Sequence, residues 1–173
     1  DKPVRILVGF APGGSADIAA RLIAERLASE LKQTVVVENK PGAGARIAAD
    51  MLKNATPDGS TIMLAPIVVP VLAPLVYSKL PYIAGTDFAP VAYLANFQFG
   101  LSVAAGHPAR NMKELVGWFK ANAAQANFGS PAPGSLPHFF GEMLSRDAKA
   151  DMVHVPFAGG AALLGALVGN QVS

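Results

Sequence analysis

Short apolar runs alternate with segments of helical periodicity from the start of the chain. The runs at 4–10, 34–38 and 61–65 are mostly apolar and β-branched, which is typical of buried strands. Between them, residues 17–31 and 43–53 place apolar side chains at helical spacing. The first part of the chain therefore predicts the order β-α-β-α-β.

A proline-rich connection at 66–90 interrupts this pattern, and we expect it to contain at most one short helix. The alternation then resumes, with strands predicted at 91–95, 100–104, 126–129 and 151–155 and helices at 112–123, 136–146 and 161–168. We place a first α/β lobe at 1–97 and a second at 98–173. Such alternation predicts an α/β fold of parallel or mixed sheets flanked by helices, with ligands at the carboxyl ends of the strands.

Composition narrows the classes of function. With 51% hydrophobic and 15% charged residues, the chain should form a buried core, and prolines within the apolar stretch at 62–76 exclude a membrane-spanning helix there. The net charge is only +2 and the basic residues are spread singly, which argues against nucleic-acid binding. Cysteine is absent and His107, His138 and His154 are scattered, so neither a metal site nor a cofactor is predicted.

The first of three glycine-rich loops, Pro12-Gly13-Gly14-Ser15-Ala16-Asp17, joins a predicted strand to a predicted helix. Unpaired amides and the helix dipole at such a junction favour an anion, either a carboxylate or a phosphate. The same residues also fit a purely structural turn in which Ser15 or Asp17 caps the helix. The loop alone leaves both interpretations open.

The second loop, at 39–45, again follows a strand and opens a helix. It lacks the dinucleotide-binding pattern, because Gly42 and Gly44 are followed by Ile47 at the last position, and it lacks the phosphate-binding P-loop spacing. Nucleotide chemistry is therefore disfavoured. Arg46 could pair with a ligand carboxylate or lie on a solvated helix face, and we favour the second alternative.

The third loop, at 129–138, brings Ser130, Ser135 and His138 close together in sequence. A serine hydrolase that uses Ser130 or Ser135 with His138 is the alternative function, although no G-x-S-x-G motif is present. Ser135 and His138 also fit the capped first turn of a helix, which is the favoured interpretation. His154 alternates within a predicted strand and is expected to be structural.

These loops and several other stretches together resemble one family, the periplasmic solute-binding proteins of tripartite tricarboxylate transporters (the Bug or TctC-like family). In the family's order, the matching stretches are Pro3–Arg5, Pro12–Asp17 with Ala20–Arg21, Val37–Gly44, Pro57–Thr61, Asp87–Val91, Gly129–Pro131 with Gly134–Ser135 and His138, His154–Phe157 with Gly159, and Gly169–Val172. They extend from one end of the chain to the other, which is more specific than any single glycine pair.

The resemblance implies a fold like that of type II periplasmic binding proteins, in which two α/β lobes with mixed sheets hold a carboxylated solute between them. It implies delivery of that small carboxylate ligand to membrane transporter subunits without chemical change, and therefore no enzyme activity and no cofactor. It also implies a periplasmic protein that was exported and lost its signal peptide. The ligand-binding residues that it implies are Phe10, Pro12, Gly13, Gly14, Ser15, Asp17, Ala65, Ser130, Pro131, Gly134, Ser135, His138 and Phe157. Because the first and third loops contain no Lys or Arg, backbone amides and ordered water would hold the carboxylate.

Some features depart from the family pattern. Ala45–Arg46 stands where Gly-Asn is common, and Ala132 stands where Gly is usual. Family members also continue well beyond residue 173, so the second lobe is expected to be partial and the protein truncated. Bare apolar sheet edges would then favour a homo-oligomer, or the chain is a fragment with an incomplete ligand pocket. A domain whose apolar surface serves only for association is a third hypothesis.

Overall fold

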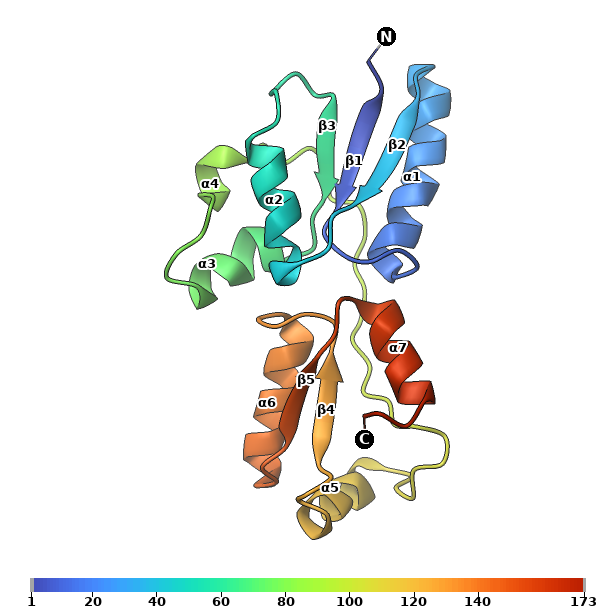
Figure 1. Ribbon diagram of the computed structural model, residues 1–173, viewed down its shortest axis with the longest axis vertical. Coiled ribbons are helices and arrows are strands. Elements are labelled where there is room, and N and C mark those ends of the chain that lie inside the picture. The colour runs from blue at the N-terminus through green and yellow to red at the C-terminus, as the bar shows by residue number, and fades with distance from the viewer. Residues whose placement is uncertain (1, 173) are drawn as a thin grey trace. The chain divides into compact units, whose positions relative to one another are not determined.

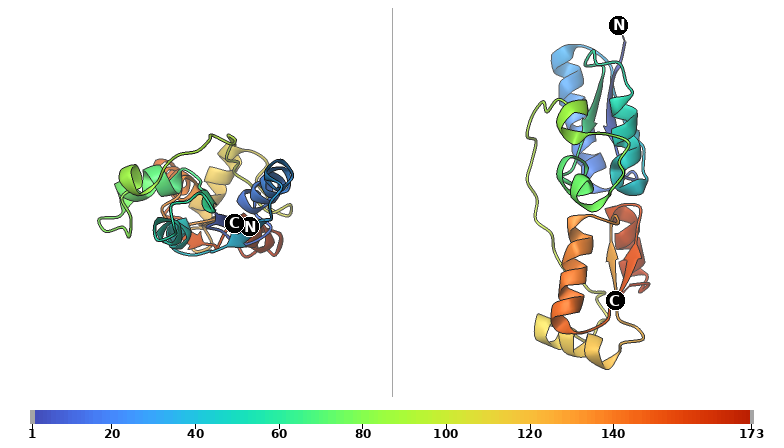
Figure 2. Two further views of the ribbon diagram at one scale, coloured as in Figure 1. Left: turned by 90° about the horizontal axis from the view of Figure 1, so that it is seen from above. Right: turned by 90° about the vertical axis from the view of Figure 1, so that its left-hand side faces the viewer.

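The computed structural model describes residues 2–172 and divides into two compact units, Asp1–Ala92 and Tyr93–Ser173. Each unit contains a small sheet with helices on both faces (Figure 1; Figure 2). The strand pairs in the described residues are all parallel. The predicted α/β class is therefore confirmed, and the units change a few residues before the predicted boundary at 97.

A three-stranded sheet forms the centre of the first unit. β1 (Val4–Val8) lies between β2 (Val35–Asn39) and β3 (Thr61–Leu64). Val4 is registered with Val35 on one side of β1, and Arg5 with Thr61 on the other. Because all three strands run in the same direction, their carboxyl ends meet at one edge of the sheet, and the loops that follow them begin there.

Helices cover the two faces of this sheet. α1 (Ser15–Leu31) covers one face and α2 (Arg46–Lys53) covers the other (Figure 1). The remaining short elements are the 3-10 turn η1 (Ala43–Ala45), the π-helical segment η2 (Val68–Leu72), α3 (Ala73–Val76) and α4 (Ala84–Asp87). The prediction of at most one short helix at 66–90 is therefore wrong. Pro74 lies in the first turn of α3, where the missing N–H breaks no helical hydrogen bond.

Two apolar clusters hold these helices on the sheet. Ala20 of α1 packs against Ile6 and Val8 of β1, which are almost completely buried. On the opposite face, Ala49 of α2 lies in a cluster with Tyr82. Burial of each large aliphatic side chain in such a cluster stabilises the fold by about 1.5–3 kcal/mol. β1 is the most deeply buried of the three strands, which fixes the position of the loop that follows it.

The second unit has a two-stranded sheet. Its elements in chain order are α5 (Met112–Ala121), β4 (Asn127–Ser130), α6 (Leu136–Ala148), β5 (Val153–Pro156) and α7 (Gly160–Val168). Because β4 and β5 are parallel, α6 and α7 both start at the carboxyl edge of this sheet. The apolar cluster of this unit includes Leu115, Phe119 and Phe128, and Leu144 of α6 packs against it.

Two glycines allow α6 and α7 to pack closely on β4. A Cβ atom at Gly141 of α6 would lie 2.1 Å from the Phe128 ring. A Cβ atom at Gly129 would lie 2.3 Å from Leu163 of α7. Since Phe128 and Gly129 are adjacent in β4 and point to opposite faces, α6 and α7 cover opposite faces of the sheet.

Residues 88–104 form no strand, so the strands predicted at 91–95 and 100–104 are wrong. The apolar side chains that suggested them are exposed, with Val91 at 88% and Tyr93 at 82%. A strand requires a neighbour to complete its hydrogen bonds, and residues 2–172 provide none for this segment. Self-association through this surface stays a prediction. None of the helices in residues 2–172 combines the length and hydrophobicity needed to cross a bilayer.

Candidate functional site

In the first unit, the candidate site lies where the loops follow β1 and β3. The chain passes from β1 to β2 on one side and then crosses to β3 on the other. Ligands of open α/β sheets bind beside the carboxyl ends of the strands at such a change of direction. Phe10 and the part of the first loop that precedes α1 follow β1, and Ala65 directly follows β3. Both are therefore at the edge where this fold places a ligand.

The first loop is open to solvent at the start of α1. Pro12, Gly13 and Ser15 are exposed, and Phe10 and Gly14 are partly exposed. Gly14 occupies the N-cap position of α1, and no side chain caps the helix. The prediction that Ser15 or Asp17 provides this cap is wrong. The N–H groups of the first helical turn consequently lack a side-chain acceptor from the cap position.

Asp17 is buried behind this loop and is fully engaged within the protein. Its Oδ2 accepts hydrogen bonds from Gly13 N at 2.9 Å and Arg21 Nε at 3.0 Å, and its Oδ1 accepts one from Asn39 Nδ2 at 2.9 Å. The hydrogen bond from Arg21 is the main cause that lowers the pKa of Asp17 to about 2, with burial acting in the opposite direction. Asp17 thus fixes the loop geometry, and its charge is neutralised by Arg21.

The second loop has an unusual backbone. Ala43, Gly44 and Ala45 have positive φ angles of 48°, 64° and 71°. Arg46 donates from Nε to Ala43 O at 2.6 Å, and its guanidinium lies 3.6 Å above the centre of the Tyr77 ring. Arg46 is therefore neither on a purely solvated face nor free in the loop, because stacking and a backbone hydrogen bond hold it.

In the second unit, loop 130–135 follows β4 and is held by two serines. Ser130 is completely buried, and its Oγ donates to Ala132 O at 3.2 Å. Ser135 donates from Oγ to the same carbonyl oxygen at 2.6 Å. Ser135 occupies the N-cap position of α6 but makes no side-chain capping bond, which differs from the predicted capping role. Both hydroxyls therefore fix the loop.

Two histidines contact this loop from α6 and β5. His138 accepts a hydrogen bond at Nδ1 from Gly134 N at 3.1 Å, and His154 Nε2 lies 2.7 Å from Ser130 Oγ. The two rings stack with centroids 3.9 Å apart. Burial and then the neighbouring His138 lower the pKa of His154, whereas Glu142 acts in the opposite direction. The prediction that the three histidines are scattered is thus wrong for this pair, although residues 2–172 contain no group suited to a metal ion.

The predicted residues of the second unit lie at one end of its sheet. Pro131 is partly exposed, Gly134 is buried, and Phe157 follows β5 and donates from its backbone N to Ser130 O at 2.9 Å. The arrangement does not support a serine hydrolase. His138 bonds Gly134 rather than either serine, and Ser130 has no surface from which to attack a substrate.

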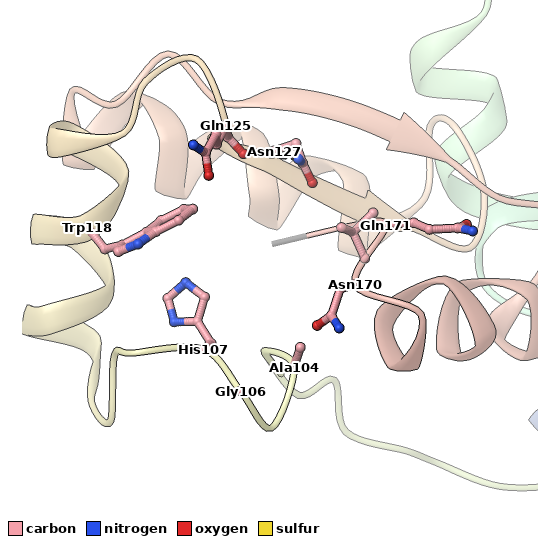
Figure 3. Close-up of a pocket in the computed structure, with 9 residues that line it drawn as sticks. Ala104, Gly106, His107, Trp118, Gln125, Asn127, Asn170 and Gln171 are labelled. Carbon is pink, nitrogen blue, oxygen red and sulfur yellow. Dashed lines mark hydrogen bonds between the residues drawn. The ribbon is translucent and has the colours of Figure 1, made fainter.

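A separate pocket of about 430 Å³ lies elsewhere in the second unit (Figure 3). Its lining residues are Ala104, Gly106, His107, Trp118, Gln125, Asn127, Asn170, Gln171 and Val172. Asn127 begins β4, so this pocket is near the amino end of the strand, opposite to the end that carries loop 130–135. It contains none of the predicted ligand-binding residues, and the strand-end loops remain the better candidates.

Sequence reasoning missed two contributors to these loops. Asn39 was part of a matched motif, but its bond to Asp17 joins elements far apart in sequence. His154 was expected to be structural only. It lies in β5, paired in register with Phe128 of β4, and this places it beside loop 130–135. A signal for His154 exists in the alternation of its strand, which puts it on the same face as Ser130 once the sheet register is known.

The comparisons with known proteins point to one family. Residues 19–173 match the family described as the tripartite tricarboxylate transporter family receptor. A UPF0065 protein in the gbd 5′ region of Cupriavidus necator is 35% identical over 177 residues, which cover 99% of this chain and 52% of that protein. This chain spans about half the length of the curated relatives it matches.

Solved structures of other proteins have the same fold as this chain. R. palustris Rpa4515 with adipate has a TM-score of 0.93 and 30% identity, with 98% of this chain and 57% of that chain covered. MatC from Rhodopseudomonas palustris with bound malate has a TM-score of 0.85 and 31% identity, with 98% and 58% covered. The likeness extends over both units of this chain.

Proposed function

Because the chain belongs to the family of tripartite tricarboxylate transporter receptors, we propose that it binds a small carboxylated solute without transforming it. Family members are substrate-binding proteins rather than enzymes, so the serine hydrolase alternative is not supported. Rpa4515 with adipate and MatC with malate are similar to this chain, and both ligands are dicarboxylates. A dicarboxylate is therefore the ligand class that these neighbours support.

The observation that carries the proposal is the uncapped start of α1 beside the ends of β1 and β3. Gly14 leaves the first-turn amides of a 17-residue helix without a side-chain acceptor, and Ser15 is exposed. Such amides and the helix dipole stabilise a carboxylate there. The buried acid of Asp17 does not oppose this, because Arg21 compensates its charge.

Loop 130–135 and Phe157 are the second set of residues proposed to contact the solute. The hydroxyl groups of Ser130 and Ser135 both donate to Ala132 O, so these side chains stabilise the conformation of the loop. The solute would then meet backbone groups and partly exposed Pro131. We also propose that the protein works in the periplasm and delivers the solute to membrane subunits of the transporter, as the family description supports.

A matched pair of substitutions at Ser15 tests the binding proposal. Ser15→Pro removes one amide donor at the first helical position, where proline fits, and Gly14 already has the extended conformation that precedes proline. Ser15→Ala removes only the hydroxyl. Calorimetric titration with adipate and malate should show binding that Ser15→Pro weakens about tenfold, with Ser15→Ala within about threefold.

The neutral diamide of adipic acid is the control ligand. It has the same chain length as adipate without its charge, so it should not compete. Absence of binding by every carboxylate tested, or equal binding of adipate and its diamide, would contradict the proposal.

A further inference from the structure

His138 holds loop 130–135 through an atom that can change its hydrogen-bonding role. Its Nδ1 accepts the N–H of Gly134 at 3.1 Å, so this nitrogen carries no hydrogen. The remaining ring hydrogen is on Nε2, which lies 3.5 Å from Glu142 Oε1 one helical turn away. Protonation of His138 would place a second hydrogen on Nδ1. Two N–H donors would then face each other, and the contact with Gly134 would be lost.

His154 holds the other end of the same loop. Its Nε2 lies 2.7 Å from Ser130 Oγ, which is fully buried. Ser130 Oγ also lies 3.2 Å from Ala132 O, and the tautomer of His154 decides which atom donates in the pair between Ser130 and His154. The loop is therefore attached to one imidazole at its start and to the other near its end.

The two imidazoles are too close to carry charge together. Their centroids are 3.9 Å apart and the rings are inclined by only 25°. Phe128 of β4 lies against His154 with centroids 5.0 Å apart and offers no compensating charge. Among the described residues in contact with the two rings, Glu142 is the acid, and α7 has no charged side chain at all. A proton taken up by the pair is thus stabilised by Glu142 on the His138 side.

We infer that His138, stacked on His154, is a pH-sensitive latch that holds Gly134 and releases loop 130–135 when it is protonated. Histidine side chains ordinarily change charge between pH 5 and 8. The latch itself rests on the contacts above, and its effect on solute affinity rests on the proposed function of the loop. Binding would weaken as the pH falls, because Gly134 and its neighbours would no longer be held in one conformation.

Nuclear magnetic resonance of the ligand-free 173-residue chain tests the latch. The ¹H–¹⁵N signal of Gly134 should shift with pH at the same midpoint as the ring protons of His138. The protection of its amide against hydrogen exchange, corrected for intrinsic rates, should fall by about tenfold between pH 7.5 and pH 5. The amide of Asn54 in the first unit, hydrogen-bonded to Asp50 O at 3.1 Å, is the internal reference.

Two substitutions separate the histidines. His138→Asn keeps an acceptor near Gly134 that cannot be protonated in this range, and the pH response of Gly134 should disappear. His154→Gln keeps a donor toward Ser130 and removes the stacked imidazole. In that variant Gly134 should still respond to pH, because the acceptor Nδ1 of His138 is unchanged.

An unchanged Gly134 signal and protection while His138 titrates would overturn the latch. So would a response of the same size in His138→Asn. These measurements use no solute, so failure of adipate and malate to bind would overturn only the binding proposal.

Discussion

Asn39, at the end of β2, donates one hydrogen bond from Nδ2 to Asp17 Oδ1 at 2.9 Å and another to Phe10 O at 3.0 Å. These bonds tie the loop after the central strand to the neighbouring strand and to the first turn of α1. Arg21 completes the arrangement on the other carboxylate oxygen. The first loop, which is proposed to bind the carboxylate of the solute, is thus itself held in place by the carboxylate of Asp17.

We therefore expect Asp17→Asn to reduce the free energy of unfolding by about 2 kcal/mol, because it replaces a buried, charge-assisted acceptor. Urea denaturation followed by circular dichroism would measure this. Asp147→Asn is the matched control, since Asp147 is an exposed helical acid whose contact with Arg146 is at 3.5 Å. It should change stability by less than about 0.5 kcal/mol. Equal effects of both substitutions would contradict the role given to Asp17.

Stability should also fall in acid. Hydrogen bonds from Arg21 and Arg5 lower the pKa values of Asp17 and Glu38 to about 2, below those of the unfolded chain. Their contribution is therefore complete above about pH 4.5 and is lost as the pH falls toward 2. In the wild type, the urea concentration at the midpoint of unfolding should be lower at pH 3 than at pH 6. The decrease should be smaller in an Asp17→Asn, Glu38→Gln double variant, and an identical decrease would exclude these two carboxylates as its cause.

Two helical glycines should respond oppositely to the same substitution. A Cβ atom at Gly141 would lie 2.1 Å from the Phe128 ring, whereas one at Gly117 in α5 meets nothing within 4 Å. Gly117→Ala should raise stability by about 1 kcal/mol through helix propensity. Gly141→Ala should lower it by about 1–3 kcal/mol, because α6 must move off β4. Thermal unfolding would test both, and stabilisation by Gly141→Ala would show that α6 is not packed as described.

The end of α6 offers a stabilising change. Lys149 has a φ of 50°, and the amides of Lys149 and Ala150 donate to Arg146 O and Ser145 O in the pattern that usually ends with glycine. Lys149→Gly should therefore raise the free energy of unfolding by about 1 kcal/mol. Lys149→Ala keeps the strained φ and should be nearly neutral. Chemical denaturation would measure the free energy of unfolding of both variants. Equal values for Lys149→Gly and Lys149→Ala would contradict the left-handed conformation of residue 149.

Most of the fold could be predicted from the hydrophobic pattern. The strands and helices of the first unit up to residue 64 are found within a few residues of the expected bounds, because each combines a clear period with turn residues at its ends. The failures lie where the pattern is ambiguous. Apolar residues at 91–95 and 100–104 resemble a strand, but pairing depends on a neighbour that sequence periodicity does not specify.

The candidate loops were also predictable in position, since glycine between a strand and a helix marks the carboxyl edge of a parallel sheet. Their internal bonding was not. Nothing near Ser130 in the sequence indicates that it meets His154 in the next strand, and its spacing to His138 suggested a different partner. Side-chain contacts between strands depend on sheet register and on helix packing, which one sequence determines only through the whole fold.

The position of β1 in the middle of its sheet has a consequence for how the first unit forms. Its partners Val35 and Thr61 lie far along the chain, and the pairings are parallel, so no local hairpin can start the sheet. Topologies of this kind fold slowly compared with those built from local contacts. During synthesis, the segment Val4–Val8 must wait with one edge bare until residues 61–64 have left the ribosome. Until then, one edge of this apolar strand is open to pairing with another chain.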